Sequence, residues 1–191
     1  MSEVRFIIIT VPPPDTSMRL ENARAAAASF SRSCAALAYP PHVTLRTGAV
    51  VPEQSIAAFA EGLQESLGAW RPFIIRMRGL FQASWQSGDG EELHMVAWRI
   101  ERDAPLLDLH ERLSAFTPFR RRAQPAFEPH LTLAFEDITA TGARDLLRHA
   151  QGDPGTFPPD LAWPCNNIGL YRREGVRWEP FIVLRTMERS P

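Results

Sequence analysis

The chain has 191 residues, of which 45% are hydrophobic and 23% are charged, so it can bury a sizeable core as one domain. The net charge of −1 and the pI of about 6.5 exclude a general polycation, and any anion binding must depend on a local patch. No stretch approaches the roughly 20 apolar residues of a membrane span, so we expect a cytoplasmic protein without membrane contact. Cys34 and Cys165 have no metal-ligand spacing and are expected to be reduced thiols.

The first half of the chain predicts alternating strands and helices. Residues 4–11 are apolar and β-branched, as in a buried strand, and an Ala-rich helix follows until Pro40-Pro41 stops it. In chain order we predict strand 4–11, helix 17–37, strand 42–50, helix 52–67 and strand 72–81.

The second half begins after a turn at Ser87-Gly88-Asp89-Gly90. Thr139 or Thr141 is a plausible N-cap for the last helix. We predict strand 93–100, helix 104–116, a basic loop over 117–128, strand 130–135, helix 139–149, and strands 163–171 and 177–187.

Two short segments nearly repeat each other. Both read P-H-[VL]-T-L, and they begin at Pro41 and Pro129. In a strand, alternate residues share a face, so His42 points the same way as Thr44, and His130 the same way as Thr132. Two imidazoles across a cleft supply a general acid and a general base near neutral pH. The alternative is a pair of buried histidines that bond to backbone, on strands that carry threonine for its β-branched shape.

The repeat extends beyond the motif. Each half has the order strand, helix, motif strand, helix, strand. The spacing from Phe6 to His42 matches that from Met95 to His130 to within one residue. We infer an internal duplication, with repeats at roughly 1–90 and 91–191 inside a single bilobal domain over 1–191.

These residues resemble the two-histidine (2H) phosphoesterase superfamily, which includes the 2′-5′ RNA ligase-like proteins and the RNA 2′,3′-cyclic phosphodiesterases. The hallmark of this superfamily is one H-x-[ST]-φ motif per lobe, where φ is apolar. The resemblance implies an α+β fold with two pseudo-symmetric lobes, each a mostly antiparallel sheet with helices on its outer face, and a central cleft between the sheets. It also implies catalysis by His42 as acid and His130 as base, with Thr44 and Thr132 binding phosphate and no metal or other cofactor.

Other residues near the motifs are candidates for substrate contact. Arg46 lies two residues beyond Thr44 and is either a phosphate clamp or a solvated strand end. Arg120, Arg121 and Arg122 form either a basic lip for a polyanion or an ordinary exposed charge run. Phe127 either stacks on an RNA base or packs in the core. His110 and His149 fall on predicted helices and are expected to face solvent.

Rival chemistries find less support in the sequence. A zinc site at His42 and His130 is conceivable, but H-x-T is not a ligand spacing and the chain has no HExxH. No G-x-S-x-G surrounds a serine, and no P-loop suggests ATP dependence.

The expected function is hydrolysis of a 2′,3′-cyclic phosphate, or a related 2′-5′ phosphodiester, at an RNA end or on a nucleotide. The modest positive charge favours short ends or mononucleotides over long RNA. The alternatives are a cyclic phosphodiesterase acting on an ADP-ribose-derived or other small nucleotide, an RNA- or nucleotide-binding module, and an RNA-end ligase. No obligate protein partner is evident, and a monomer is expected.

Overall fold

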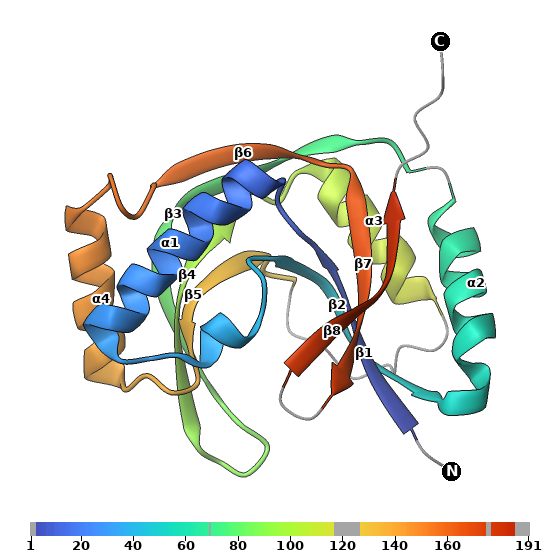
Figure 1. The fold of residues 1–191 in the computed structure, drawn as a ribbon, viewed down its shortest axis with the longest axis horizontal. Helices are drawn as coiled ribbons and strands as arrows, with labels where there is room; N and C mark the ends of the chain where they lie inside the picture. The colour runs from blue at the N-terminus through green and yellow to red at the C-terminus, as the bar shows by residue number, and fades with distance from the viewer. Residues whose placement is uncertain (1–2, 69, 117–126, 175–176, 186–191) are drawn as a thin grey trace.

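A computed structural model describes residues 3–68, 70–116, 127–174 and 177–185. These residues form an α+β structure, which confirms the predicted fold class (Figure 1). The strands are β1 (Glu3–Thr10), β2 (Val43–Pro52), β3 (Phe73–Gln86), β4 (Glu92–Ile100), β5 (His130–Phe135), β6 (Asp160–Cys165), β7 (Asn167–Glu174) and β8 (Arg177–Arg185). The helices are α1 (Pro14–Ser31), α2 (Ile56–Leu67), α3 (Ala104–Ala115) and α4 (Ala140–Gly152), with short 3-10 helices η1 (Ala35–Ala38) and η2 (Glu53–Ser55).

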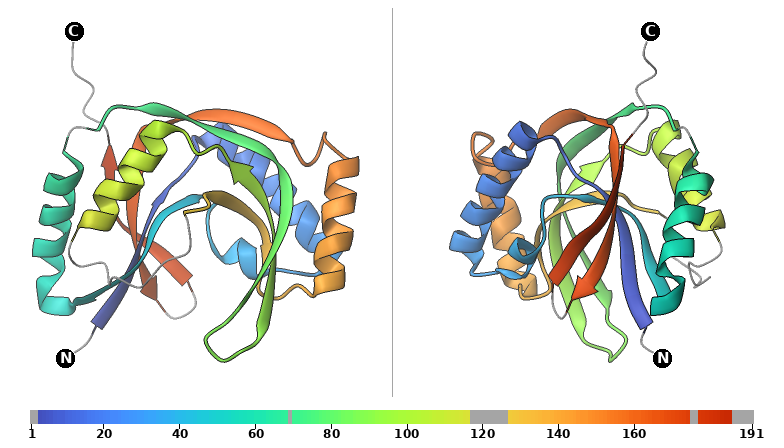
Figure 2. Two further views of the ribbon diagram at one scale, coloured as in Figure 1. Left: turned by 180° about the vertical axis from the view of Figure 1, so that it is seen from behind. Right: turned by 45° about the vertical axis from the view of Figure 1, so that its right-hand side comes forward.

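The strands form one antiparallel sheet in the order β6-β3-β4-β5-β2-β1-β7-β8. The two motif strands, β2 and β5, are neighbours at its centre, where Val43 and Leu131 form the one residue pair that the register gives. Figures 1 and 2 show the sheet arching around a concave side. The cleft expected between two separate sheets is therefore the concave side of a single curved sheet.

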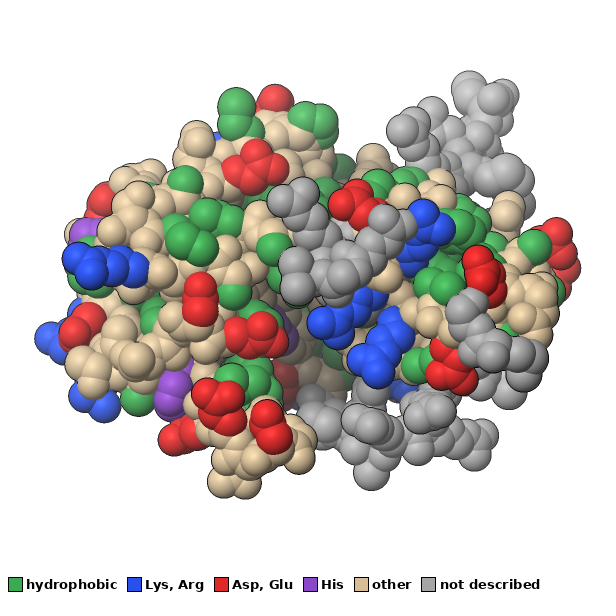
Figure 3. Space-filling view, turned by 60° about the horizontal axis from the view of Figure 1, so that its bottom comes forward, with side chains coloured by type: hydrophobic (Ala, Val, Ile, Leu, Met, Phe, Trp, Pro, Cys, Tyr) green, Lys and Arg blue, Asp and Glu red, His purple; other side chains and the backbone are tan. Residues whose placement is uncertain are grey.

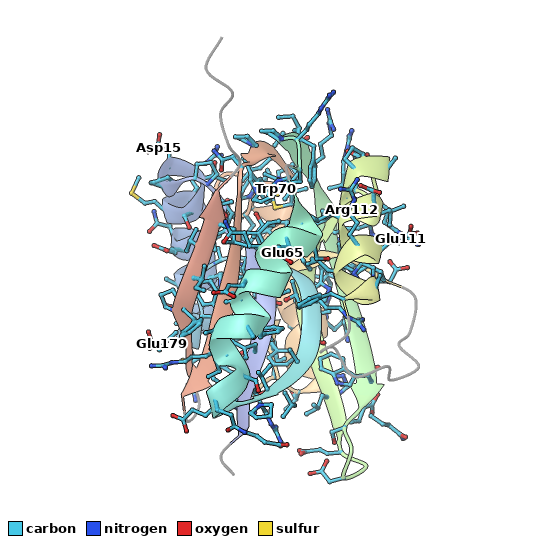
Figure 4. The ribbon with its side chains drawn as sticks, turned by 90° about the vertical axis from the view of Figure 1, so that its right-hand side faces the viewer. Asp15, Glu65, Trp70, Glu111, Arg112 and Glu179 are labelled. Carbon is cyan, nitrogen blue, oxygen red and sulfur yellow. The ribbon has the colours of Figure 1, made fainter. Side chains whose placement is uncertain are left out.

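The helices cover the outside of this arch in two pairs. Helix α1 packs with α4, and together they contact β3, β4 and β5. Helix α2 packs with α3, and α3 contacts β2 (Figure 2). Figure 4 looks onto the α2–α3 pair, with Glu65 and Glu111 on its solvent side. Because α1 precedes β2 in the chain but covers β5, each half of the sheet is covered by one helix from each half of the chain.

Several predicted boundaries move, for local reasons. Helix α1 begins at Pro14, since proline is tolerated in the first turn, and it ends at Ser31, before the C-cap Arg32, whose φ of 62° is left-handed. The predicted strand 163–171 divides at Asn166 into β6, which pairs with β3, and β7, which pairs with β1. Thr139 is the N-cap of α4, and its hydroxyl accepts a hydrogen bond from the Gly142 N–H.

The core lies between the sheet and the two helix pairs. Its largest fully buried side chains include Trp98, Trp163 and Phe157. The Trp98 Nε1–H donates to the Pro158 carbonyl over 2.9 Å, so burial leaves that indole N–H paired. Among the described residues, no helix is both long enough and apolar enough to cross a membrane.

Both motif strands contain a β-bulge at the same place. On β2, Thr44 pairs with Ile9 and Arg46 pairs with Ile8, which leaves Leu45 as an extra residue. On β5, Thr132 pairs with Ala97 and Ala134 pairs with Val96, which leaves Leu133 as the extra residue. The strict alternation of faces therefore ends directly after each threonine.

A second register shift follows on β2 near Gly48, whose φ is 88°. We expect Gly48→Ala to lower the free energy of unfolding by about 1–2 kcal/mol, because a Cβ disfavours this left-handed conformation. A Cβ would meet nothing within 4 Å there, so the cost is conformational and not steric crowding.

The control is Gly88→Ala on the β3–β4 turn, where a Cβ also meets nothing within 4 Å and φ is not positive. Urea unfolding of both variants checks this expectation. Equal stability of the two variants would contradict it.

Candidate active site

The four motif side chains meet in one pocket on the concave side of the sheet. His42, Thr44, His130 and Thr132 all line a cavity of about 220 Å³. Figure 3 looks onto this side of the molecule, where the surface is hollowed and both basic and acidic side chains border the hollow. The alternation within each H-x-T segment puts each histidine on the face of its threonine, and the pairing of β2 with β5 brings the two segments together.

Other lining residues come from segments that carry no motif. The remaining wall is formed by Ile7, Arg24, Ala36, Tyr39, Pro40, Pro41, Thr47 and Phe135. The bulges account for Thr47 and Phe135, each of which lies three residues beyond its motif threonine. Arg24 belongs to α1, so a helix as well as the sheet contributes to the pocket wall.

Arg46 does not line this pocket, although unbroken alternation would put it on the face of Thr44. The bulge at Leu45 changes the facing of the residues that follow, and Arg46 is only 7% exposed. In the sequence, no proline or glycine marks a bulge at Leu45, so the strand pattern alone does not reveal it.

The two histidines make the same hydrogen bond. Nδ1 of His42 lies 2.8 Å from the Pro40 carbonyl oxygen, and Nδ1 of His130 lies 2.8 Å from the Glu128 carbonyl oxygen. A carbonyl oxygen only accepts, so each Nδ1 carries the proton and donates it. In the neutral form of each ring the other nitrogen, Nε2, is then left with a free lone pair.

His42 is the more perturbed of the two. Burial lowers the pKa of His42 to about 4, and the nearby charges of Arg24 and His130 lower it further, against the opposing effect of the bond to Pro40. In the ligand-free protein at neutral pH, His42 therefore carries no net charge.

Phe81 and Arg99 lie beside His130. Arg99 pairs with His130 in the β4–β5 register, and its guanidinium lies 4.9 Å from the centre of the Phe81 ring. The Phe81 ring meets the His130 ring edge to face, with centroids 6.4 Å apart. Further along β3, the Trp85 ring stacks on the ring of Phe135 from β5, with centroids 5.5 Å apart. Phe135 lines the pocket, so this aromatic pair borders it.

Phe127 lies behind the motif strands and not in the pocket lining. Its ring stacks on His110 with centroids 3.8 Å apart, and it packs against the core. His110 Nδ1–H donates to the Leu45 carbonyl over 2.8 Å, because a carbonyl oxygen only accepts. The expectation that His110 faces solvent is therefore wrong, whereas His149 is exposed. The candidate basic lip, Arg120 to Arg122, lies outside the described residues.

Asp137 connects the end of the second motif strand to the segment before the first motif. Its carboxylate accepts hydrogen bonds from the Ser33 hydroxyl, from the Cys34 N–H at 2.7 Å and from the Ala35 N–H at 2.9 Å. Ala36 of that segment lines the pocket. Sequence reasoning missed this aspartate because no local pattern pairs it with residues so far away in the chain.

The side chains that could bind a metal ion are scattered. In the part of the chain that the structure describes, no group of three or more His, Cys, Asp or Glu side chains is arranged to hold an ion.

Comparisons with known proteins agree with this architecture. A family model described as the 2′-5′ RNA ligase superfamily matches residues 12–177. E. coli LigT complexed with 3′-AMP aligns with a TM-score of 0.61 at 14% identity, over 98% of this chain and 100% of LigT. TT0787 of Thermus thermophilus aligns with a TM-score of 0.62 at 18% identity, over 95% of this chain and 97% of its own. Kluyveromyces marxianus Usb1 gives a TM-score of 0.51 at 13% identity, with coverage of 95% and 97%.

At these identities the structural likeness establishes the fold alone. The search of curated proteins gave no significant match. The family model, in contrast, spans most of the chain and contains both H-x-T segments. This chain belongs to the 2′-5′ RNA ligase superfamily of two-histidine phosphoesterases.

Proposed function

We propose that this protein opens the 2′,3′-cyclic phosphate of an RNA end or a small nucleotide by two-histidine acid–base catalysis. The observation that carries the proposal is the matched pair of imidazoles, each bonded through Nδ1 to a backbone carbonyl, in the wall of one pocket. A group that is oriented through one ring nitrogen presents the other to a reacting atom. One chain supplies both imidazoles, which supports a monomer as the working unit.

The proposed step needs one neutral and one protonated histidine. Nε2 of His130 takes a proton from water as the water oxygen attacks phosphorus. The bond between phosphorus and one ribose oxygen breaks, and Nε2–H of His42 donates its proton to that oxygen. The product is a phosphomonoester beside a free hydroxyl, and the proton on His130 returns to His42 through solvent.

The two threonines complete the proposal. Negative charge builds on the non-bridging phosphate oxygens as water attacks, and a positioned hydroxyl that donates to them stabilises this charge. Thr44 and Thr132 share the pocket with the histidines, which supports this role. If a ribose hydroxyl takes the place of water as the nucleophile, its oxygen bonds to phosphorus, the same ring P–O bond breaks, and two chains are joined, so ligation and hydrolysis use the same groups.

The protonation of His42 must change when substrate binds. With a pKa of about 4, the ligand-free imidazole has no Nε2 proton to donate at neutral pH. A phosphate anion beside it favours the charged form and raises the pKa, so His42 becomes an acid only in the complex.

Substitution of either histidine tests the catalytic roles. We expect His42→Ala and His130→Ala each to lower kcat/KM for a 2′,3′-cyclic-phosphate-ended oligoribonucleotide by about 10²–10⁴-fold, because each removes a proton-transfer group. Phosphorus NMR with EDTA present follows the opening. His149→Ala is the matched control, since His149 is exposed on α4 and should retain wild-type activity.

If the wild type leaves the oligoribonucleotide intact, the RNA-end proposal is wrong. A cyclic phosphate on a small nucleotide then becomes the substrate to test. If the protein opens neither substrate, the proposed catalysis is wrong, and nucleotide binding without turnover is the function to test.

Substitution of the threonines tests the phosphate contacts. We expect Thr44→Val and Thr132→Val to lower kcat by about 10–100-fold while the fold is retained, because valine keeps the shape and loses the donor. Thr141→Val, at an exposed site on α4, controls for the substitution itself. Steady-state kinetics on the same substrate measure the effect, and unchanged kcat in both pocket variants would remove the threonines from the proposal.

The low pKa of His42 also predicts how stability depends on pH. The unfolded chain binds a proton at His42 below about pH 6.5, whereas the folded protein does so only near pH 4, so the free energy of unfolding falls as pH drops through this interval. We expect His42 to contribute up to about 3 kcal/mol to this fall. Urea unfolding from pH 4 to 6.5 should therefore give a steeper pH dependence for the wild type than for His42→Asn, and identical slopes would refute the shift.

A further inference from the structure

Arg24 is a buried cation whose bonding is incomplete. It lies on α1 and is 3% exposed. Nη1–H donates to the Tyr39 carbonyl over 2.9 Å, whereas Nε is buried without a hydrogen-bond partner among the described residues. Within the same residues, no ion pair joins the guanidinium to a carboxylate. Burial lowers its pKa to about 10, which still leaves it charged at neutral pH.

A buried charge without a partner is costly, and proteins normally pair it or neutralise it. An arginine does not deprotonate in this pH range, so the partner that fits best is an anion, which both accepts from Nε–H and offsets the charge. Among the described residues, the Glu21 carboxylate is near enough to raise the pKa of Arg24 but forms no ion pair with it, so a bound anion would supply the direct partner that the guanidinium lacks.

The surroundings of Arg24 determine where that anion lies. Arg24 lines the histidine pocket and also a second, larger hollow, which shares Tyr39 and Pro40 with it. Glu21 and Glu179 line the second hollow, and their carboxylates repel an anion there. Among the described residues, no carboxylate lines the histidine pocket, whereas three threonines from the motif strands do: Thr44, Thr47 and Thr132. The anion is therefore favoured on the histidine side.

We propose that Arg24 is a phosphate-binding residue of the active site, which holds the same phosphate group that Thr44 and Thr132 contact and makes protonation of His42 depend on that group being bound. The identity of the anion rests on the proposed function, whereas the need for an anion rests on Arg24 itself.

The coupling follows from the position of the charge. In the ligand-free protein, the Arg24 charge disfavours a proton on His42. A bound phosphate offsets that charge and attracts the proton. His42 is then protonated when substrate is bound. In the empty pocket it stays neutral, so Arg24 and a protonated His42 do not lie side by side there.

Binding of inorganic phosphate tests the proposal without any turnover. We expect Arg24→Gln to raise the Kd for phosphate by about 10–100-fold, because a charge-assisted hydrogen bond is lost. Arg19→Gln on the exposed side of α1 should change the Kd by less than about twofold. Isothermal titration calorimetry measures both, and circular dichroism confirms that each variant is folded. A wild-type Kd in Arg24→Gln overturns the proposal.

The protonation of His42 gives a second measurement, which a purely structural role would not change. By proton NMR, phosphate should move the His42 titration to higher pH in the wild type. In Arg24→Gln the ligand-free titration should already lie higher, and phosphate should move it less. If the Gln variant does not fold, Arg24→Met is used in both experiments, since it fills similar space without charge. Equal shifts in wild type and variant would refute the coupling.

These results are separable from the proposed function. Arg24-dependent phosphate binding without any cyclic-phosphate opening supports this inference and refutes the proposed reaction. If the protein opens the cyclic phosphate but binds phosphate equally well with and without Arg24, the proposed reaction is supported and this inference is refuted.

Discussion

The site depends on two backbone carbonyls, those of Pro40 and Glu128, which hold the Nδ1 atoms of His42 and His130. Each carbonyl belongs to the residue before a proline, and a proline confines the residue that precedes it to extended backbone. The prolines of the two P-H-x-T segments, both buried, thus fix the chain just where a carbonyl must face the imidazole two residues later. Ring orientation and tautomer are set by the main chain, so a substitution elsewhere in the wall can alter the charge of a histidine without redirecting its Nε2.

The distance between the histidines depends on a different set of contacts. Val43 and Leu131 make a single bridge between the half-sheets, which is too little to hold them rigidly. The chain also crosses between the half-sheets. Helix α1 precedes β2 but covers β5, and β6 of one half-sheet continues into β7 of the other. The Asp137 carboxylate adds three hydrogen bonds to the segment before the first motif. Residues remote from the pocket therefore help to set the distance between the two imidazoles, on which the proposed acid–base catalysis depends.

Features of the site that depend on a short repeated pattern could be predicted from the sequence. Features that depend on contacts between distant residues could not. Period-2 alternation brought each histidine and threonine to one face, since only two residues of strand are involved. It failed for Arg46, because a bulge at Leu45 follows from pairing with β1 and not from local propensity. Arg24 was missed for a related reason: it lies in an Ala-rich helix whose burial depends on packing against β5 and α4, and a lone arginine there resembles a solvated one.

In the proposed mechanism, the empty and occupied pockets differ in the charge of His42 and in whether the charge of Arg24 is paired. The protein carries a formal net charge of −1, so its overall field does not attract a polyanion. The attraction is local instead, and it comes from a guanidinium that the protein keeps buried at a cost in stability. A second cation at His42 would add to that cost, which explains why the imidazole is neutral until an anion arrives. The buried positive charge of Arg24 and the lowered pKa of His42 then belong to one electrostatic arrangement. In the proposed mechanism, a bound phosphate pairs with that charge and raises the pKa of His42, so that His42 holds the proton that the cleavage requires.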